Sequence, residues 1–264
     1  MRVDPAFHAL LADPRVHLRR PGPSLTVAQL REAANAFMAR AAGPAMASVT
    51  DRSVTGPDGQ PIALRVYEPV QGAYAAARIV FCHGGGFVFG SLDTHDAMAR
   101  SLAQHSGAAV VAVDYRLAPE HPHPAAVEDC LAVVRSLRAE DPEDAAVPLA
   151  LAGDSAGGHI ALESALRLAA ADETVAHVAV LYPVISAACN SDSMRVFGEG
   201  HMLTREAMRW FWECYLGEGA ESAARTTDLL QVSLVALPPV TLVTAGCDPL
   251  RDEGERFARS EEHT

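Results

Sequence analysis

The stretch Gly153-Asp154-Ser155-Ala156-Gly157-Gly158 constrains the fold of this chain more than any other. A short apolar run, 147–152, precedes it, and a helical pattern that starts near Ile160 follows it. A serine with glycine two residues before and after it is typical of a sharp strand-to-helix turn, because the bend leaves no room for a Cβ at either flanking position. We therefore expect a strand, a tight turn that exposes the Ser155 hydroxyl, and a helix.

The rest of the chain repeats this strand–helix alternation. Apolar and β-branched runs predict strands at 78–82, 108–113, 148–152, 175–182 and 240–245, and helical patterns cover 93–106, 124–138 and 156–171. Two alternating segments, 49–54 and 62–67, flank Gly56-Pro57-Asp58-Gly59 and predict a β-hairpin. Continuous apolar strands fit a parallel sheet that is covered on both faces. The predicted class is α/β, a mostly parallel sheet with helices on both faces.

Two segments interrupt this alternation and predict a helical cap. Residues 1–45 are helix-like, and residues 186–236 contain a helical stretch, 205–212, with both tryptophans of the chain. The predicted core is then 46–185, continued by 237–258, with the cap lying over Ser155. We expect at least one of Trp210 and Trp212 to be a packing anchor of its helix.

Composition excludes several classes of function. The net charge of −12 argues against nucleic-acid binding, which needs a basic face. No apolar run is as long as a membrane span, and the first residues lack the apolar core of a signal peptide. Five scattered cysteines without C-x-x-C spacing favour reduced thiols. We therefore expect a cytoplasmic protein with no nucleic-acid or membrane partner.

The chemistry of a serine nucleophile predicts its partners. A hydroxyl attacks poorly near neutral pH, so it needs a base, and the base needs a carboxylate that orients it. Asp248 follows the predicted strand 240–245 directly, so it leaves the sheet at the same carboxyl edge as Ser155. Asp252 lies four residues further on, where capping a helix or pairing with an arginine is expected. Ser155 is thus the predicted nucleophile and Asp248 the predicted acid.

These motifs resemble those of the hormone-sensitive-lipase-like esterases, the bacterial family IV or HGGG branch of the α/β-hydrolase fold. The resemblance covers nearly the whole chain and rests on the turn around Ser155 and on His83-Gly84-Gly85-Gly86-Phe87, Gly90-Ser91-Leu92-Asp93-Thr94-His95, Asp114-Tyr115-Arg116-Leu117-Ala118-Pro119-Glu120, Tyr182-Pro183, Leu203-Thr204-Arg205-Glu206 and Asp248-Pro249-Leu250-Arg251-Asp252. His159 is a departure, because the family often has asparagine there. We interpret it as a first-turn helix residue at the periphery of the site.

The resemblance implies a carboxylic ester hydrolase that acts on small-molecule esters with short acyl chains through a serine acyl-enzyme. It assigns the oxyanion hole to the backbone N–H groups of Gly84, Gly85 and Ala156, which would meet the negative charge that develops on the carbonyl oxygen. His83 is expected to be structural. No metal or cofactor is implied, and the intact protein is expected to form a homodimer.

The family's catalytic histidine has no counterpart in this sequence. It should lie roughly 30 residues beyond Asp248, because a crossover helix and a parallel strand must come first. His263 follows Asp248 too closely to carry that helix and strand. The remaining candidates fit loop or helix-cap positions better than the role of a base; these are His95, His121, His123 and His201.

The end of the chain suggests a reason for the missing histidine. Residues 259–264 read like the translation of a common sequencing adapter, so we expect a non-native tail after Ala258. In that case the last strand and helix of the family fold are missing, the chain is truncated, and as given it is expected to be inactive.

Two alternatives remain open. The same scaffold serves lactone, amide and carbamate hydrolases. A chain without a base would also suit a non-catalytic protein that binds a small ligand in the same place.

Overall fold

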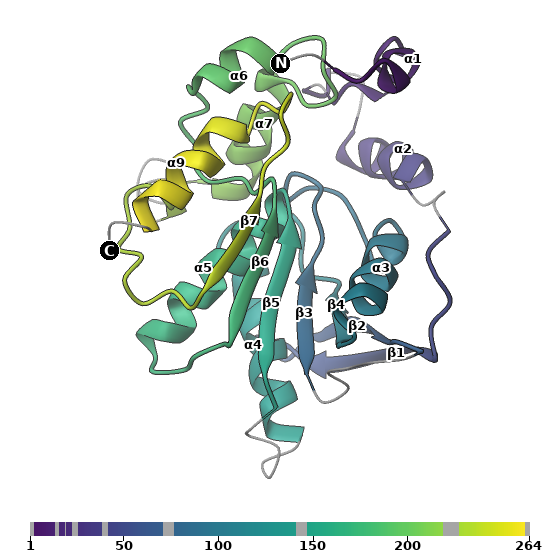
Figure 1. Cartoon of the computed structure of the whole chain (residues 1–264), viewed down its shortest axis with the longest axis vertical. Coiled ribbons are helices and arrows are strands. Elements are labelled where there is room, and N and C mark those ends of the chain that lie inside the picture. The colour runs from purple at the N-terminus through teal and green to yellow at the C-terminus, as the bar shows by residue number, and fades with distance from the viewer. Residues whose placement is uncertain are drawn as a thin grey trace.

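The computed structural model describes residues 3–13, 16–18, 20–22, 26–38, 42–70, 77–140, 147–218 and 227–261. Within these ranges a seven-stranded sheet runs through the molecule in the order β1-β2-β4-β3-β5-β6-β7 (Figure 1). The strands are β1 (Ser48–Thr55), β2 (Pro61–Glu68), β3 (Arg78–Cys82), β4 (Ala109–Val113), β5 (Leu149–Asp154), β6 (His177–Leu181) and β7 (Val240–Val243).

The direction of the strands follows from their connections. β1 and β2 form the predicted antiparallel hairpin around Gly59, where φ is +81°. β2 is antiparallel to β4, whereas β4, β3, β5, β6 and β7 are parallel to their neighbours. The predicted mostly parallel sheet is therefore confirmed. Because the parallel strands share one direction, β3, β5, β6 and β7 all end at one edge, here called the carboxyl edge.

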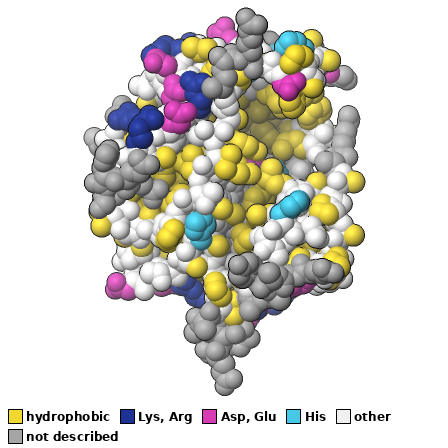
Figure 2. Space-filling model, in the orientation of Figure 1, with side chains coloured by type: hydrophobic (Ala, Val, Ile, Leu, Met, Phe, Trp, Pro, Cys, Tyr) yellow, Lys and Arg dark blue, Asp and Glu magenta, His cyan; other side chains and the backbone are white. Residues whose placement is uncertain are grey.

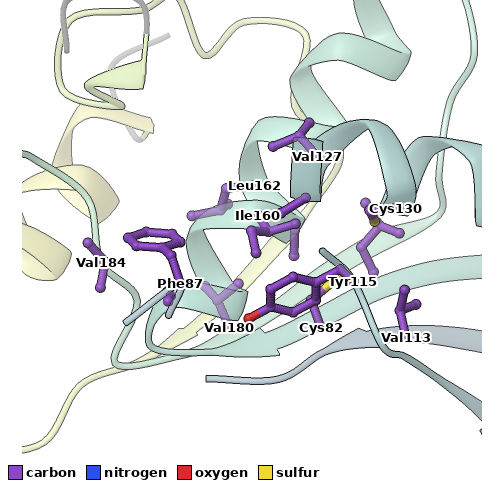
Figure 3. Packing of buried hydrophobic residues seen from close by; sticks show 14 of the residues in the cluster. Cys82, Phe87, Val113, Tyr115, Val127, Cys130, Ile160, Leu162, Val180 and Val184 are labelled. Carbon is purple, nitrogen blue, oxygen red and sulfur yellow. The ribbon is translucent and has the colours of Figure 1, made fainter. Parts of the chain in front are cut away.

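Helices cover both faces of the sheet (Figure 1). α3 (Asp96–Ser106) packs on one face around Tyr67 and Phe81. α4 (Ala125–Glu140), α5 (Ala156–Ala170) and α9 (Arg251–Glu261) contribute to the larger hydrophobic cluster on the other face. Figure 3 shows Ile160 and Leu162 of α5 in this cluster, beside residues of β3, β4 and β6. Each such side chain that is fully buried stabilises the fold by roughly 1.5–3 kcal/mol.

The remaining helices lie beyond the carboxyl edge (Figure 1). They are the short helices η1 (Pro5–Phe7) and α1 (His8–Leu11), then α2 (Val27–Met38), α6 (Asp192–Phe197) and α7 (Arg205–Leu216). The two segments predicted to form a cap touch each other, because the Leu18 N–H donates to the Met202 carbonyl and the Leu18 carbonyl accepts from the Thr204 hydroxyl at 2.8 Å. Arg31 of α2 in turn donates to the Val88 carbonyl at 2.6 Å. Both segments are thus anchored near the predicted site.

Cap helix α7 is amphipathic, and its buried face packs against the loop after β3 and against α5. Phe211, Trp212 and Tyr215 are each at most 2% exposed, whereas Trp210 is only half-buried. Trp212 is therefore the predicted packing anchor.

The last predicted strand is shorter than expected. β7 ends at Val243 rather than at 245, because its neighbour β6 ends at Leu181, which pairs with Val243. The Tyr182 N–H donates to the Val243 carbonyl at 2.5 Å and completes the ladder. Beyond this point the chain turns into the loop that carries Asp248. Residues 259–261 continue α9, and the rest of the predicted tail lies outside the described residues.

Three further observations concern membrane spans, metal ligands and cysteines. None of the helices described is long and apolar enough to cross a membrane. No group of three or more His, Cys, Asp or Glu side chains in the described ranges is arranged to hold a metal ion. All five cysteines are free.

Candidate active site

Ser155 occupies the turn between β5 and α5. Its backbone has φ 51° and ψ −119°, a conformation that costs on the order of 1–3 kcal/mol for a residue with a side chain and is typical of functional sites. The turn is held by two hydrogen bonds, because the Ser155 N–H donates to the Leu181 carbonyl at 2.9 Å and the Val184 N–H donates to the Ser155 carbonyl at 3.1 Å. A Cβ on Gly157 would overlap the Cys82 carbonyl, so this position needs glycine as predicted.

Asp248 lies beyond the end of β7, at the carboxyl edge as predicted. Its carboxylate accepts from the Leu250 N–H at 2.9 Å. Burial raises the pKa of Asp248, while the Leu250 amide and the nearby Arg251 oppose that rise. Burial raises the pKa of Tyr182 to about 12, and the negative charges of Asp154 and Asp248 raise it further. The Ser155 N–H donates to the Leu181 carbonyl and the next amide, that of Tyr182, donates to Val243, so the end of β7 lies next to the turn that carries Ser155.

Asp252 has the structural role expected of it. Its carboxylate pairs with Arg251 at 2.8 Å and accepts from the Ser193 N–H at 2.7 Å. Both contacts lie in the first turn of α9, where a carboxylate also suits the helix dipole. Asp252 thus holds α9 against α6.

The glycine loop after β3 approaches Ser155 from the neighbouring strand. Gly85 has φ +129° and Gly86 has φ +58°, so both adopt conformations that favour glycine. The Gly84 N–H, however, donates to Asp154 Oδ1 at 2.8 Å. An amide has one proton, so this contact corrects the prediction that Gly84 is an oxyanion donor.

Three other N–H groups near Ser155 remain available. The amides of Gly85, Gly86 and Ala156 donate to no acceptor among the described residues. Ala156 is the first residue of α5, where the N–H groups lack partners within the helix and the helix dipole favours an anion. The predicted donors Gly85 and Ala156 are therefore free to bind an oxyanion, and Gly86 joins them.

Asp154 connects the glycine loop to the turn. Its Oδ1 accepts from Gly84 and lies 3.5 Å from His95 Nε2, and His95 Nδ1 lies 2.8 Å from the Thr94 hydroxyl. Burial, together with the neighbouring His95, lowers the pKa of His83 to about 4. The His83 ring stacks between His95 and Tyr115, with centroids 5.3 and 4.4 Å away. His83 is structural, as predicted.

No histidine in the described ranges hydrogen-bonds to or pairs with Asp248. His95 faces Asp154, His123 pairs with Glu163 at 2.8 Å, and His201 contacts the Glu199 carbonyl. The His121 N–H donates to the Leu117 carbonyl, and its ring forms no hydrogen bond or ion pair with Ser155 or Asp248 in the described ranges. His263 lies outside the described residues. A base for Ser155 is therefore not found in this part of the chain.

Two buried carboxylates near the site were not singled out from the sequence. Glu163 follows the turn by two helical turns of α5, and Glu253 follows Asp248 by five residues. Burial raises the pKa of Glu253 to about 8. Hydrogen bonds from the Ile185 and Ser186 amides favour the ionised form and offset part of that rise. Both residues occupy positions that a surface helix residue would also fill, so the sequence carries no signal for their burial.

The close contact between Gly84 and Asp154, here called the Gly84–Asp154 clamp, can be tested by adding one methyl group at Gly84. A Cβ on Gly84 would overlap Asp154 Oδ2 and lie 3.0 Å from Asp154 Cγ. We expect Gly84→Ala to lower the free energy of unfolding by roughly 2 kcal/mol, measured by urea denaturation. Gly22→Ala is the control, because a Cβ there meets nothing within 4 Å. Equal stability of the two variants would refute the clamp.

The comparison with known proteins agrees with this geometry. A family model described as the alpha/beta hydrolase fold matches residues 79–263. The chain belongs to the α/β-hydrolase family.

The similar proteins are esterases. The carboxylic ester hydrolase LipN of Mycobacterium tuberculosis is 40% identical over 225 residues, which cover 80% of this chain and 58% of LipN. The ethyl acetate hydrolase of Pseudomonas putida is 38% identical over 218 residues, covering 80% of this chain and 69% of that protein. The α/β-hydrolase thus spans about three fifths to two thirds of the length of these relatives.

A solved structure extends the likeness to the whole chain. The hyperthermophilic esterase of the archaeon Pyrobaculum calidifontis superposes with a TM-score of 0.88 at 34% identity, covering 100% of this chain and 86% of that one. The fold of the α/β-hydrolase and its family are therefore established by sequence and by structure.

The face above the carboxyl edge is hollowed. Figure 2, in the orientation of Figure 1, shows a depression lined mainly by hydrophobic side chains between the helices that lie over the strand ends. Phe211 of α7 lies against the glycine loop, because a Cβ on Gly86 would come within 2.5 Å of its ring. Apolar walls beside the candidate oxyanion donors suit an uncharged organic substrate.

Proposed function

We propose that this protein is a carboxylic ester hydrolase in which Ser155 is the nucleophile and Asp248 orients the base. The observation that carries the proposal is the strained Ser155 turn beside three unpaired amides, at the same sheet edge as the half-buried Asp248. The relatives named as ester hydrolases, at 38–40% identity, support the same reaction.

The reaction follows from these positions. The Ser155 Oγ attacks the ester carbonyl carbon, its proton passes to a base, and the carbonyl oxygen becomes an oxyanion that accepts from Gly85, Gly86 and Ala156. Collapse breaks the bond to the alcohol, which leaves with the proton and leaves an acyl group on Ser155. Water then attacks the acyl-enzyme by the same route and releases the acid. We propose that the base is a histidine outside the described residues.

The substrate class we propose is small esters with short acyl chains. Helices α2 and α7 are anchored over the carboxyl edge, and Phe211 closes the space above Gly86. An enclosed acyl pocket disfavours long chains because they must bend or displace the cap. The relative from Pseudomonas putida is named for ethyl acetate, whose acyl group has two carbons.

The test is an acyl-length series in the presence of imidazole, which can act as a base from solution. We expect p-nitrophenyl esters of two to four carbons to react fastest, and intact-mass and peptide analysis to find the acyl group on Ser155. A maximum at twelve carbons or more would contradict the short-chain proposal. A chain that binds the esters but forms no acyl-Ser155 would instead be a binding protein.

We also propose that the intact protein works in the cytoplasm and as a homodimer. The free cysteines support a reducing compartment. In the chain as given, the edge strand of the described sheet is β7, in which Thr241 and Val243 are exposed. An exposed strand edge favours association with another chain.

A further inference from the structure

We propose that His159 is a positioning residue that holds the Ser155 turn through the segment that follows β6, residues 182–185. This inference rests on the proposed function of Ser155. His159 lies one helical turn after Ser155 in α5, and its N–H is 3.3 Å from the Ser155 carbonyl. Its side chain has no exposed surface. The sequence places it at the periphery of the site, whereas the structure places it directly beneath the turn.

The ring of His159 and the carbonyl of Ser155 hold the same residue. His159 Nδ1 lies 3.1 Å from the Val184 carbonyl, which can only accept, so Nδ1 carries a proton and donates. The Val184 N–H donates to the Ser155 carbonyl at 3.1 Å. Val184 is thus fixed on both sides of its backbone, once by the nucleophile's carbonyl and once by His159.

The same segment also reaches the acid. The next N–H, that of Ile185, donates to Glu253 Oε1 at 2.8 Å. Glu253 lies in α9, five residues after Asp248. Residues 182–185 therefore connect the nucleophile turn to the helix that begins at the acid loop, and the His159 ring fixes the middle of this connection.

The opposite side of the ring is held by charge and by aromatic edges. His159 Nε2 faces Glu163 Oε2 at 3.5 Å, and Glu163 Oε1 also pairs with His123 and Arg167. Burial works to raise the pKa of Glu163, but the hydrogen bond with His123 and the neighbouring His159 hold it well below its usual range. The carboxylate therefore stays ionised and lies against the Nε2 side of the His159 ring.

Three aromatic rings meet His159 at right angles. Phe87, Trp212 and Tyr215 have centroids 5.6, 5.2 and 5.8 Å from the imidazole, with interplanar angles of 86–90°. Phe87 belongs to the glycine loop, and the other two belong to cap helix α7. His159 thus has one orientation, which aims Nδ1 at Val184.

Three substitutions separate this role from simple core packing. Asparagine places an amide at the δ position, so His159→Asn can still donate to Val184. Glutamine places its amide one bond further out, so His159→Gln loses that donor but remains polar. His159→Leu fills space without a donor. If His159 only fills space, His159→Leu should protect the Val184 amide and preserve kcat at least as well as His159→Asn. If His159 positions the turn, His159→Asn should preserve both better than the other two variants.

The first readout needs no turnover. Amide hydrogen exchange at Val184 reports its bond to the Ser155 carbonyl directly. We expect exchange in His159→Gln and His159→Leu to be about tenfold faster than in the unsubstituted protein, and exchange in His159→Asn to stay within about twofold. Equal protection of Val184 in all three variants would overturn the proposal.

The second readout is imidazole-dependent hydrolysis of p-nitrophenyl acetate. We expect the glutamine and leucine variants to lose about tenfold in kcat with KM within about twofold, because a displaced nucleophile affects the reaction more than ester binding. Unchanged kcat in both would overturn the proposal. If the unsubstituted protein forms no acyl-Ser155, the proposed function fails, and the exchange at Val184 alone decides the role of His159. If leucine prevents folding, the comparison of asparagine with glutamine decides.

Discussion

Replacing Ser155 by alanine should abolish imidazole-dependent ester hydrolysis. The variant keeps the fold and the free amides of Gly85, Gly86 and Ala156, but it has no oxygen on which an acyl-enzyme can form. In serine hydrolases the loss of the nucleophile removes nearly all of the triad's contribution, so we expect a fall of at least roughly 10³-fold. The measurement is release of p-nitrophenol at several imidazole concentrations, with the uncatalysed reaction of imidazole subtracted.

Ser164→Ala is the matched control for this experiment. Ser164 is buried in the same helix, α5, but away from the turn. It should keep the full imidazole-dependent rate. Hydrolysis that persists in Ser155→Ala and falls in Ser164→Ala would place the chemistry elsewhere and remove the basis of the proposed function.

Replacing Glu253 by glutamine should stabilise the protein at alkaline pH. Burial raises the pKa of Glu253 to about 8, from the 4.5 of an exposed glutamate. Between these values the unfolded chain has lost the proton while the folded protein retains it, so stability falls as the pH rises through this window. Glutamine resembles the protonated acid and can still accept from the Ile185 N–H. We expect Glu253→Gln to be more stable by on the order of 3–5 kcal/mol at pH 8.

The measurement is the free energy of unfolding in urea at pH 5, 6.5 and 8. The advantage of Glu253→Gln should grow with each step, because the penalty in the unsubstituted protein grows with pH. Glu255→Gln is the control, since Glu255 lies in the same helix with its side chain 45% exposed. If the two variants follow the same pH dependence, Glu253 is ionised in the folded protein and our account of its burial is wrong.

Local pattern predicted the architecture of this protein well. The apolar runs that form β3, β4, β5 and β6 have little choice of structure, because continuous apolar strands separated by helices can be buried only in a covered parallel sheet. The order of the sheet then places the ends of β5 and β7 at one edge, as the sequence predicts for Ser155 and Asp248. The glycine at 157 was equally predictable, since the turn has no space for a side chain.

The oxyanion hole could not be predicted residue by residue. Three consecutive glycines permit several backbone paths, and nothing in the motif says which amides face the substrate. The structure removes one candidate donor through a distant residue, because Asp154, 70 positions along the chain, accepts from the Gly84 N–H. The neighbouring amides of Gly85 and Gly86 are left free as a result.

Sequence determined the fold and the places of Ser155 and Asp248 at one edge of the sheet, because each depends on local periodicity or on a turn that admits few residue types. Tertiary structure alone decided which side chains surround them. His159, Glu163 and Glu253 stand in ordinary helical positions, yet packing against other parts of the chain buries them completely or almost completely. A helix pattern shows that one face is covered, but the partner that covers it comes from another part of the chain, and that partner determines whether a polar group stabilises the fold, destabilises it or positions the nucleophile.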